Sequence, residues 1–398
     1  MNKIEWREVE LKEVAEIVSG STPSTIKQEY WNGDINWITP AEIIDGNNWY
    51  YYETRKKITK KGLDSASINL FPKGTVMLTS RAPIGKVAIA GKEMCSNQGF
   101  KNFICDSKQL NNEYLYFWLR LKKDYLNSIG NGATFKEISK SIVSKIKIPL
   151  PFSDGKPNLK EQERIVKILE KAEKLKERGK KAKYLLDEYL KSVFYEMFLK
   201  DEGRLEIKKL VEVTQKITDG KHGDCEDLEQ SGYYFISAKD IINGKISYEN
   251  ARQIKKEGYS EVNKRVNLEL NDILITNSGT IGRIAIVDNK DKVNRTTFQK
   301  SVAVIKLNKD LLTPTFVRYF LETTKERLMR TSSGSSQKNL LLKDIRNIQI
   351  PIPSISYQHK FAKIVEQIEK MKENMGKTNK DSEELFDSLI QKSFRGEL

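Results

Sequence analysis

The tetrapeptide IPLP stands at residues 148–151, and IPIP stands at residues 350–353. Proline disfavours the helical conformation in the residue before it, so each tetrapeptide predicts an extended segment. About forty residues with the apolar periodicity of one long helix follow each tetrapeptide. Because the same strand-to-helix junction occurs twice, half a chain apart, we expect an internal duplication.

Other phrases repeat in the same order along the two halves. Their offsets are 198, 197 and 202 residues, and the helical tails match at an offset of 196. Offsets that vary by a few residues predict loop insertions within one large duplicated module. The matching phrases are WITPAEI (37–43) with FISAKDI (235–241), RAPIGKVAI (81–89) with SGTIGRIAI (278–286), and residues 114–151 with residues 316–353.

Each module combines a mixed part with a long helix. Short β-branched runs, such as TVMLTS (75–80) and DILITN (272–277), alternate with Gly and Asn turns, and a helix is expected at 112–127 and at 314–329. We therefore predict an α/β (α+β) fold with two tandem-duplicated globular domains, which suits 398 residues. The predicted segments are domain one at 1–157, a central spacer helix at 158–200, domain two at 201–353 and a C-terminal spacer helix at 354–398.

Apolar residues recur at heptad spacing in both long helices. A sustained period of about 3.5 residues predicts a coiled-coil seam, and the simplest partner of each helix is the other one. Antiparallel helices, each roughly 57 Å long, would place one domain at each end in a pseudo-twofold arrangement. The alternative is that each helix packs only on its own domain. The predicted seam residues are Ile165, Ile168, Ala172, Leu175, Leu186, Tyr189, Val193, Phe361, Ile364, Ile368, Met371, Met375, Leu385 and Leu389.

The bulk charge indicates an anionic partner. The formal net charge is +15, and the isoelectric point is near 9.3. A basic surface collects polyanions, of which nucleic acid is the commonest and an acidic membrane surface the second. A Lys-rich and Asn-rich composition inherited from an AT-rich genome is the alternative explanation.

The cysteines and the N-terminal residues bear on the compartment. Cys95, Cys105 and Cys225 are an odd number for disulfides and do not have metal-ligand spacing. The first residues do not form a signal-peptide core, and no apolar run approaches the ~20 residues that span a bilayer. We therefore expect a soluble, cytoplasmic protein.

The sequence does not contain a recognisable catalytic or cofactor motif. Its two histidines, His222 and His359, belong to no His or Cys cluster, so neither zinc chemistry nor Cys/His nucleophilic catalysis is supported. GTIGR (279–283) and APIGK (82–86) lack the P-loop pattern and are expected to form tight turns between strands. No dinucleotide fingerprint is present, nor are the proline-containing loops of methyltransferases and nucleases. We therefore predict a binding protein without catalytic residues or a metal site.

Polar and basic loops occur at matching places in both modules. DNA reading needs Lys and Arg for phosphates, Arg or Lys for guanine, and Asn or Gln for adenine. Phe100, Phe135 and Phe298 are interleaved among these loops, which we expect to bind DNA as a set, although a solvated surface charge is the simpler explanation of any single lysine. The candidate DNA-binding residues are Arg55, Lys56, Lys57, Lys60, Lys61, Ser80, Arg81, Lys86, Asn97, Gln98, Lys101, Lys136, Lys221, Arg252, Asn277, Arg283, Arg295, Gln299, Lys300, Gln337 and Lys338.

Three features of the chain point to a known family. They are the duplicated architecture, the paired Ile-Pro-x-Pro junctions, and the phrases SGSTPS…YWNGDINWITPAEI (19–43) and GTVMLTSRAPIGKVAI (74–89). In these features the chain resembles the specificity subunit of Type I restriction–modification systems over essentially its full length. The second module departs from the first phrase, with TDGKHGDCEDLEQSGYYFISAKDI (218–241) in its place. Such divergence is expected if the two domains read different half-sites.

The resemblance implies a non-catalytic role. In this family, two target recognition domains each bind one half of a bipartite double-stranded DNA site. The helices set the gap between the halves and dock methyltransferase subunits, which in turn carry the restriction subunits. S-adenosylmethionine, ATP and Mg²⁺ are expected on those partner subunits, and this chain is expected to hold no cofactor itself.

Two further hypotheses about the function are compatible with the sequence. The same architecture would suit the specificity module of a Type IIB-like restriction system, whose partner chain would combine nuclease and methyltransferase. A stand-alone sequence-specific DNA-binding regulator would bind DNA tightly without any methyltransferase. An unrecognised nuclease is the remaining alternative.

Overall fold

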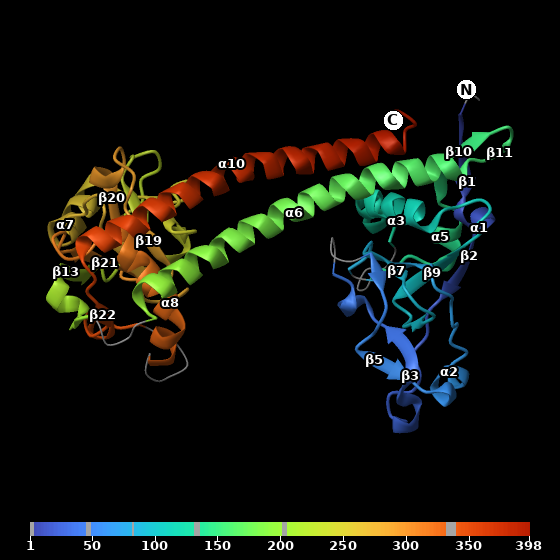
Figure 1. Ribbon diagram of the computed structural model, residues 1–398, viewed down its shortest axis with the longest axis horizontal. Helices are drawn as coiled ribbons and strands as arrows, with labels where there is room; N and C mark the ends of the chain where they lie inside the picture. Colours follow the sequence, from blue (N-terminus) through green and yellow to red (C-terminus); the bar gives the residue numbers. More distant parts are fainter. Residues whose placement is uncertain (1–3, 45–48, 82, 131–135, 201–204, 332–339) are drawn as a thin grey trace. The chain divides into compact units, whose positions relative to one another are not determined.

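The computed structural model describes residues 4–44, 49–81, 83–130, 136–200, 205–331 and 340–398, except the side chains of residues 326–331. The chain forms two compact units, residues 1–180 with 377–398 and residues 181–376. Each unit therefore holds one mixed domain together with segments of both long helices, α6 (Leu159–Phe198) and α10 (Ile355–Ser393) (Figure 1).

The first unit is built on a five-stranded sheet of order β2-β9-β6-β7-β4. All its pairings are antiparallel except the one between β7 and β4. Two three-stranded sheets, β5-β3-β8 and β1-β10-β11, accompany it. The elements are β1 (Glu5–Glu10), α1 (Leu11–Val14), β2 (Ala15–Ser19), η1 (Gln28–Tyr30), β3 (Trp31–Ile38), η2 (Pro40–Glu42), β4 (Tyr50–Tyr51), β5 (Lys56–Ile58), α2 (Lys60–Ser65), β6 (Val76–Thr79), β7 (Val87–Ala90), β8 (Cys95–Ser96), β9 (Phe100–Cys105), α3 (Asn112–Leu121), α4 (Lys123–Ile129), α5 (Lys140–Ser144), β10 (Lys147–Ser153) and β11 (Lys156–Pro157).

The second unit repeats this plan with a four-stranded sheet of order β13-β21-β18-β19. Its β17-β14-β20 sheet has one parallel pair, as β5-β3-β8 has in the first unit. The elements are β12 (Ile207–Lys209), η3 (Leu210–Val213), β13 (Thr214–Asp219), β14 (Tyr234–Ile236), η4 (Ala238–Asp240), β15 (Ile241–Ile242), β16 (Lys245–Ile246), β17 (Arg252–Gln253), α7 (Lys256–Val266), β18 (Ile273–Thr276), β19 (Ile284–Ile286), η5 (Val293–Arg295), β20 (Thr296–Phe298), β21 (Val302–Leu307), α8 (Pro314–Thr331), α9 (Leu342–Arg346) and β22 (Gln349–Pro351).

A buried glutamine fixes the start of each long helix to its mixed domain. Gln162 accepts a hydrogen bond from the Asn111 backbone N–H at 2.8 Å and donates to the Gln109 carbonyl at 3.0 Å. Gln358, 196 residues later, accepts from the Thr313 N–H at 2.7 Å. Both side chains are fully buried, and an unpaired buried amide would cost about 1–3 kcal/mol, so the paired glutamine specifies how the helix docks. The junction after each Ile-Pro-x-Pro is thereby defined.

The far end of each long helix completes the core of a unit that the other helix begins. In the first unit, the last turns of α10 and the residue after it bury three aromatic or aliphatic side chains, and the Phe394 ring lies 4.9 Å from Tyr114. In the second unit, the end of α6 does the same, with Phe194 at 5.7 Å from Phe316. The equivalent buried residues, each pair 196 apart, are Leu190 and Phe386, Phe194 and Ile390, and Phe198 and Phe394.

Within each unit the two helices run antiparallel. At the start of α6, Arg164 donates to the carbonyl of Leu398 at the chain's end. At the start of α10, the Tyr357 ring lies 5.4 Å from Phe198 at the end of α6. The predicted pairing of the long helices with each other is therefore confirmed, and each helix packs on the mixed domains as well.

The heptad assignment needs correction at four of its residues. Leu175, Tyr189, Met371 and Leu385 are 49, 52, 53 and 48% exposed. The buried stripe near the end of each helix has a four-residue spacing instead, because it packs on α8 or α3 and not only on the other long helix. The remaining predicted seam residues are buried or half-buried, namely Ile165, Ile168, Ala172, Leu186, Val193, Phe361, Ile364, Ile368, Met375 and Leu389.

No helix among the described residues has the length and apolar character needed to cross a bilayer.

Candidate nucleic-acid interface

In the first unit, loop ends that are far apart in sequence are joined by backbone hydrogen bonds. We call this arrangement the loop frame. It brings together the segments that follow β2, β3, β6 and β8, and the segment just before α5. The bonds are Ser21 N to Ser96 O (2.9 Å), Asn97 N to Ile38 O (3.1 Å), Ser80 N to Gly99 O (2.7 Å) and Ile138 N to Ser80 O (2.9 Å).

The second unit builds the same frame. Each bond has a counterpart between residues that are 197 to 202 positions further along the chain, as the duplication requires. Since main-chain groups make these bonds, the frame tolerates different side chains in the two copies. The counterparts are Lys221 N to Phe298 O (2.8 Å), Gln299 N to Ile236 O (2.9 Å), Asn277 N to Ser301 O (3.0 Å) and Leu340 N to Asn277 O (2.8 Å).

One glycine in each frame permits the close approach of two loops. A Cβ atom added at Gly20 would lie 1.8 Å from the Asn97 carbonyl oxygen, and one at Gly220 would lie 2.0 Å from the Phe298 carbonyl oxygen. Both obstacles are backbone atoms that no rotamer change can remove. Any larger residue at either position must therefore push the loops apart.

A threonine closes the turn that follows β6 and the turn that follows β18. The Thr79 hydroxyl accepts from the Lys86 N–H at 2.9 Å and donates to the Pro83 carbonyl at 2.7 Å. Thr276 accepts from the Arg283 N–H at the same distance. Gly85 and Gly282 have φ values of +92° and +75°, which residues with a side chain rarely adopt. The turns predicted for APIGK and GTIGR are confirmed.

The first frame carries a network of three charged side chains. The Glu137 carboxylate accepts from Arg81 Nε at 2.9 Å and from Lys101 Nζ at 3.2 Å. Lys101 is only 4% exposed and also donates to the Ser80 hydroxyl at 3.2 Å. Burial works to raise the pKa of Glu137, but the hydrogen bonds from Arg81 and Lys101 outweigh it and lower that pKa. The carboxylate therefore stays ionised near neutral pH.

The second frame carries different polar groups. The Oδ1 atom of Asn277 and the Oγ1 atom of Thr297 are buried without a hydrogen-bond partner among the described residues. At its edge, Lys221 forms an ion pair with Glu261 at 2.7 Å, and His222 contacts Asp219 at 2.8 Å. Equivalent backbones thus present different side-chain chemistry.

Two of the predicted DNA-binding cations are engaged inside the domains. Lys86 Nζ donates to the Ile43 carbonyl at 2.7 Å. In the second unit, Arg283 Nη1 donates to the Ile241 carbonyl at 3.2 Å, which is the equivalent bond. Both cations tie the segment after η2 or η4 to the turn, so the structure gives them a positioning role, and DNA contact by them stays a prediction.

The basic stretch 53–62 lies on β5 and α2, outside the loop frame. Lys57, Lys60 and Lys61 pair with Glu53, Asp64 and Glu29 at 2.9, 3.1 and 3.2 Å. Exposed pairs of this kind contribute at most ~1 kcal/mol and would exchange readily for phosphates. Lys56 lies over the Trp31 ring at 5.6 Å.

The remaining predicted DNA-binding residues are held in ion pairs, exposed to solvent or part of a loop frame. Arg252 is held by Asp224 and Asp227 at 2.6 and 2.5 Å. Arg55, Gln98, Lys136, Arg295 and Lys300 are exposed, Asn97 and Gln299 belong to the frame, and Gln337 and Lys338 lie outside the described residues. Sequence reasoning missed Glu137, although its position directly after Lys136 in TFKEIS was a signal that a carboxylate would lie among the cations.

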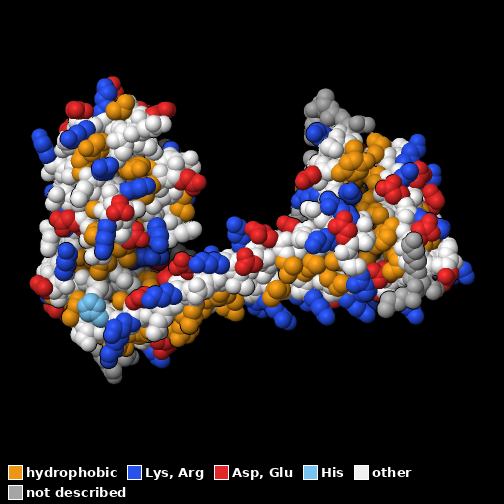
Figure 2. All heavy atoms as spheres, turned by 90° about the horizontal axis from the view of Figure 1, so that it is seen from above, with side chains coloured by type: hydrophobic (Ala, Val, Ile, Leu, Met, Phe, Trp, Pro, Cys, Tyr) orange, Lys and Arg blue, Asp and Glu red, His pale blue; other side chains and the backbone are white. Residues whose placement is uncertain are grey.

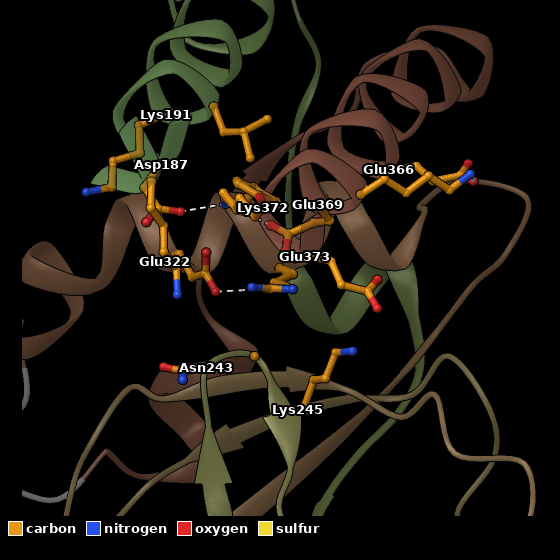
Figure 3. Close-up of a pocket in the computed structure, with 15 residues that line it drawn as sticks. Asp187, Lys191, Asn243, Lys245, Glu322, Glu366, Glu369, Lys372 and Glu373 are labelled. Carbon is orange, nitrogen blue, oxygen red and sulfur yellow. Dashed lines mark hydrogen bonds and ion pairs between the residues drawn. The ribbon is translucent and has the colours of Figure 1, made fainter. Parts of the chain in front are cut away.

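Charged hollows repeat beside the long helices. In the second unit, a hollow of about 720 Å³ lies between α6, α8, α10 and the β15–β16 hairpin (Figure 3). Its charges pair with one another, since Lys372 meets Asp187 at 2.5 Å and Arg318 meets Glu322 at 2.9 Å. The first unit has an equivalent hollow of about 660 Å³, and the shared lining positions are Glu173 and Glu369, Lys176 and Lys372, and Glu177 and Glu373.

On the face drawn in Figure 2, basic and acidic side chains are interspersed over both domains and along the helices.

Burial raises the pKa of Cys95 and Cys105 to about 12, so these thiols remain protonated and poorly nucleophilic at neutral pH. The loop frames are therefore the best-defined candidate sites of the described residues.

A family model, the type I restriction modification DNA specificity domain, matches residues 3–183 and again residues 204–382. The chain belongs to this family. It is a specificity subunit with two target recognition domains, and the specificity domain recognises DNA rather than catalysing a reaction.

Named relatives agree with this assignment. The type I restriction enzyme MjaIX specificity subunit of Methanocaldococcus jannaschii is 29% identical over 418 aligned positions, which cover 99% of this chain and 94% of the relative. The EcoBI specificity subunit of Escherichia coli is 33% identical over 175 positions, which cover 42% of this chain and 36% of that subunit.

Two solved structures share the fold. The type I restriction–modification S subunit from M. genitalium aligns with a TM-score of 0.54 at 18% identity, covering 99% of this chain and 97% of its own. A chain from a study of complex assembly and conformational transition of the type I R-M system aligns with a TM-score of 0.64 at 17% identity, covering both chains completely. These likenesses concern the fold alone.

The Gly20→Ala variant tests the loop frame of the first specificity domain. Its Cβ collides with the Asn97 carbonyl, so frame hydrogen bonds worth about 1 kcal/mol each should be lost. We expect a lower thermal unfolding midpoint and at least ~10-fold weaker DNA binding, measured by calorimetry and fluorescence anisotropy.

Gly376→Ala is the matched control, since nothing lies within 4 Å of its added Cβ on α10. We expect this variant to be unchanged or slightly more stable, because alanine is the better helix former by up to ~1 kcal/mol. Equal changes in unfolding midpoint and DNA affinity in the two variants would contradict the role given to the loop frame.

Proposed function

We propose that this specificity subunit directs a type I restriction–modification complex to a bipartite double-stranded DNA site, with each recognition domain reading one half. The observation that carries the proposal is the loop frame, which is built twice from equivalent backbone hydrogen bonds and filled with different side chains. An equal scaffold fits the same duplex geometry, while unequal contents suit two different half-site sequences.

The proposed partners follow from the same complex. Two methyltransferase subunits would dock on the chain, one for each unit, and restriction subunits would join through them. Equivalent hollows in both units suit a partner that binds twice. Exposed apolar side chains on the long helices add surface for such docking: Leu175, Tyr184, Leu185, Tyr189, Tyr195, Met371 and Leu385.

The chemistry would reside on those partners. S-adenosylmethionine would bind the methyltransferase, and ATP and Mg²⁺ would serve the restriction subunit, while this chain supplies base recognition and no cofactor. Its place would be the cytoplasm, where the DNA lies and where the free thiols of Cys95, Cys105 and Cys225 would stay reduced.

The helices are proposed to set the spacer between the half-sites. α6 and α10 span 40 and 39 residues, which corresponds to roughly 60 Å each. A helix is stiff along its axis, so its length would be transmitted to the distance between the two sequences that are read.

A genome-wide map of adenine methylation, made in the host with and without this coding sequence, tests the function. We expect one bipartite motif to disappear when the sequence is deleted and to return on complementation. A methylome that does not change would contradict the proposal, and tight binding of DNA by the chain without any methyltransferase would favour a stand-alone regulator.

Removing one heptad from both helices tests the spacer. Residues 176–182 and 376–382 are suitable, because Gly179 faces Asn379 at the middle of both deletions. Each helix shortens by ~10 Å, so the spacer in the methylation motif should lose about three base pairs while both half-sites persist. An unchanged spacer in an active deletion variant would refute the ruler role.

A further inference from the structure

The network in the first loop frame leaves one end of an arginine free. Arg81 uses Nε to bind Glu137 and makes no other side-chain hydrogen bond or ion pair among the described residues. Its side chain is 46% exposed, and its backbone also bridges to Glu137. The Nη1 and Nη2 groups therefore remain available at the edge of the frame.

Hydrogen bonds to the other residues of the network fix the orientation of the two free Nη groups of Arg81. Glu137 is held by Lys101, and Lys101 is buried between Glu137 and the Ser80 hydroxyl. A carboxylate that binds Nε restricts rotation of the guanidinium plane, so the two Nη groups point in a set direction. Directed, paired donors are what a bidentate acceptor requires.

A base fits this arrangement better than a phosphate does. An ionised carboxylate lies directly beside the guanidinium, and it would repel a phosphate that approached the same group. A phosphate contact also gains little from a fixed plane, since a flexible cation serves equally well. The guanine edge offers O6 and N7 as neutral paired acceptors, and arginine is their commonest protein partner.

At the three equivalent positions, the sequence of the second domain has uncharged residues. The strand registers place Ala303 where the first domain has Lys101. Ser278, two residues after β18, corresponds to Arg81, two residues after β6. By the sequence offset, Asn339, outside the described residues, replaces Glu137. A contact that merely positioned DNA would be needed by both halves, whereas a contact present in one half suits base-specific reading.

We propose that Arg81 is a specificity-determining residue that reads a guanine through Nη1 and Nη2 in the half-site of the first recognition domain. Glu137 and Lys101 are its positioning residues. This inference rests on the proposed function, because it requires that the first domain reads DNA. It assigns a base to one side chain, which neither the family nor the fold supplies.

The Arg81→Lys variant, expressed with the methyltransferase, tests the assignment. Lysine keeps the charge and loses the planar pair of donors. We expect the methylation motif to relax at one guanine position of one half-site, with a roughly 10- to 100-fold loss of discrimination there and no change in the other half-site. Glu137→Gln should relax the same position to a smaller degree, because its amide orients Arg81 less strongly.

Arg7→Lys is the matched control. Arg7 is similarly exposed, at 44%, and is paired with Glu5 at 2.7 Å, but β1 lies outside the loop frame. We expect this variant to leave the motif unchanged at every position. Relaxation in Arg7→Lys equal to that in Arg81→Lys would overturn the assignment.

Other outcomes are equally distinct. Uniform weakening across all sequences, with no relaxation at any one position, would mean that Arg81 does not read a base and would overturn the assignment. An unaltered motif and affinity would overturn it as well. If Arg81→Lys abolishes modification, Glu137→Gln binding to duplexes substituted at each half-site position gives the same readout. Absence of any motif with the unmodified chain would instead refute the proposed function.

Discussion

Backbone hydrogen bonds between loop ends are the constraint on which the candidate recognition surfaces depend. In each domain they join segments that are distant in sequence, and a glycine at position 20 or 220 allows the approach. Main-chain bonds are indifferent to side-chain identity, so the frame can be preserved while its contents change. A conserved backbone frame with different side chains would allow one duplicated module to serve the two proposed half-sites.

The long helices are part of the cores as well as connections between modules. Gln162 and Gln358 dock their starts on the mixed domains, and Phe194 and Phe394 insert near their ends. Burying a large apolar side chain contributes about 1.5–3 kcal/mol, so each unit depends on residues from both halves of the chain. The stability of each domain therefore depends on both long helices.

Much of the fold could be predicted from the sequence, because duplication and helical periodicity are long-range patterns. The repeated phrases located equivalent strands and turns, and the long apolar periodicity gave both helices. The heptad register failed at Leu175 and Leu385, since the pattern cannot tell packing on another helix from packing on a domain.

The candidate site was predicted less completely than the fold. Basic loops were identified by composition, but composition does not show which cations are already engaged. Lys86 and Arg283 bind backbone carbonyls inside the domains, and Arg252 is held by two aspartates. Glu137 was missed because its contacts with Arg81 and Lys101 join segments that are distant in sequence, which composition does not show.

We infer that both domains share one backbone frame and differ in the side chains that it carries. The most direct test of this claim is a chain that carries the first recognition domain twice. Residues 4–158 would replace residues 205–354, and the helix residues that pack on the domain would be exchanged to match. If the frame is one scaffold whose contents decide the bases, the methylation motif should contain the first half-site's sequence on both sides of the spacer. A motif that keeps the original second half-site would contradict the account.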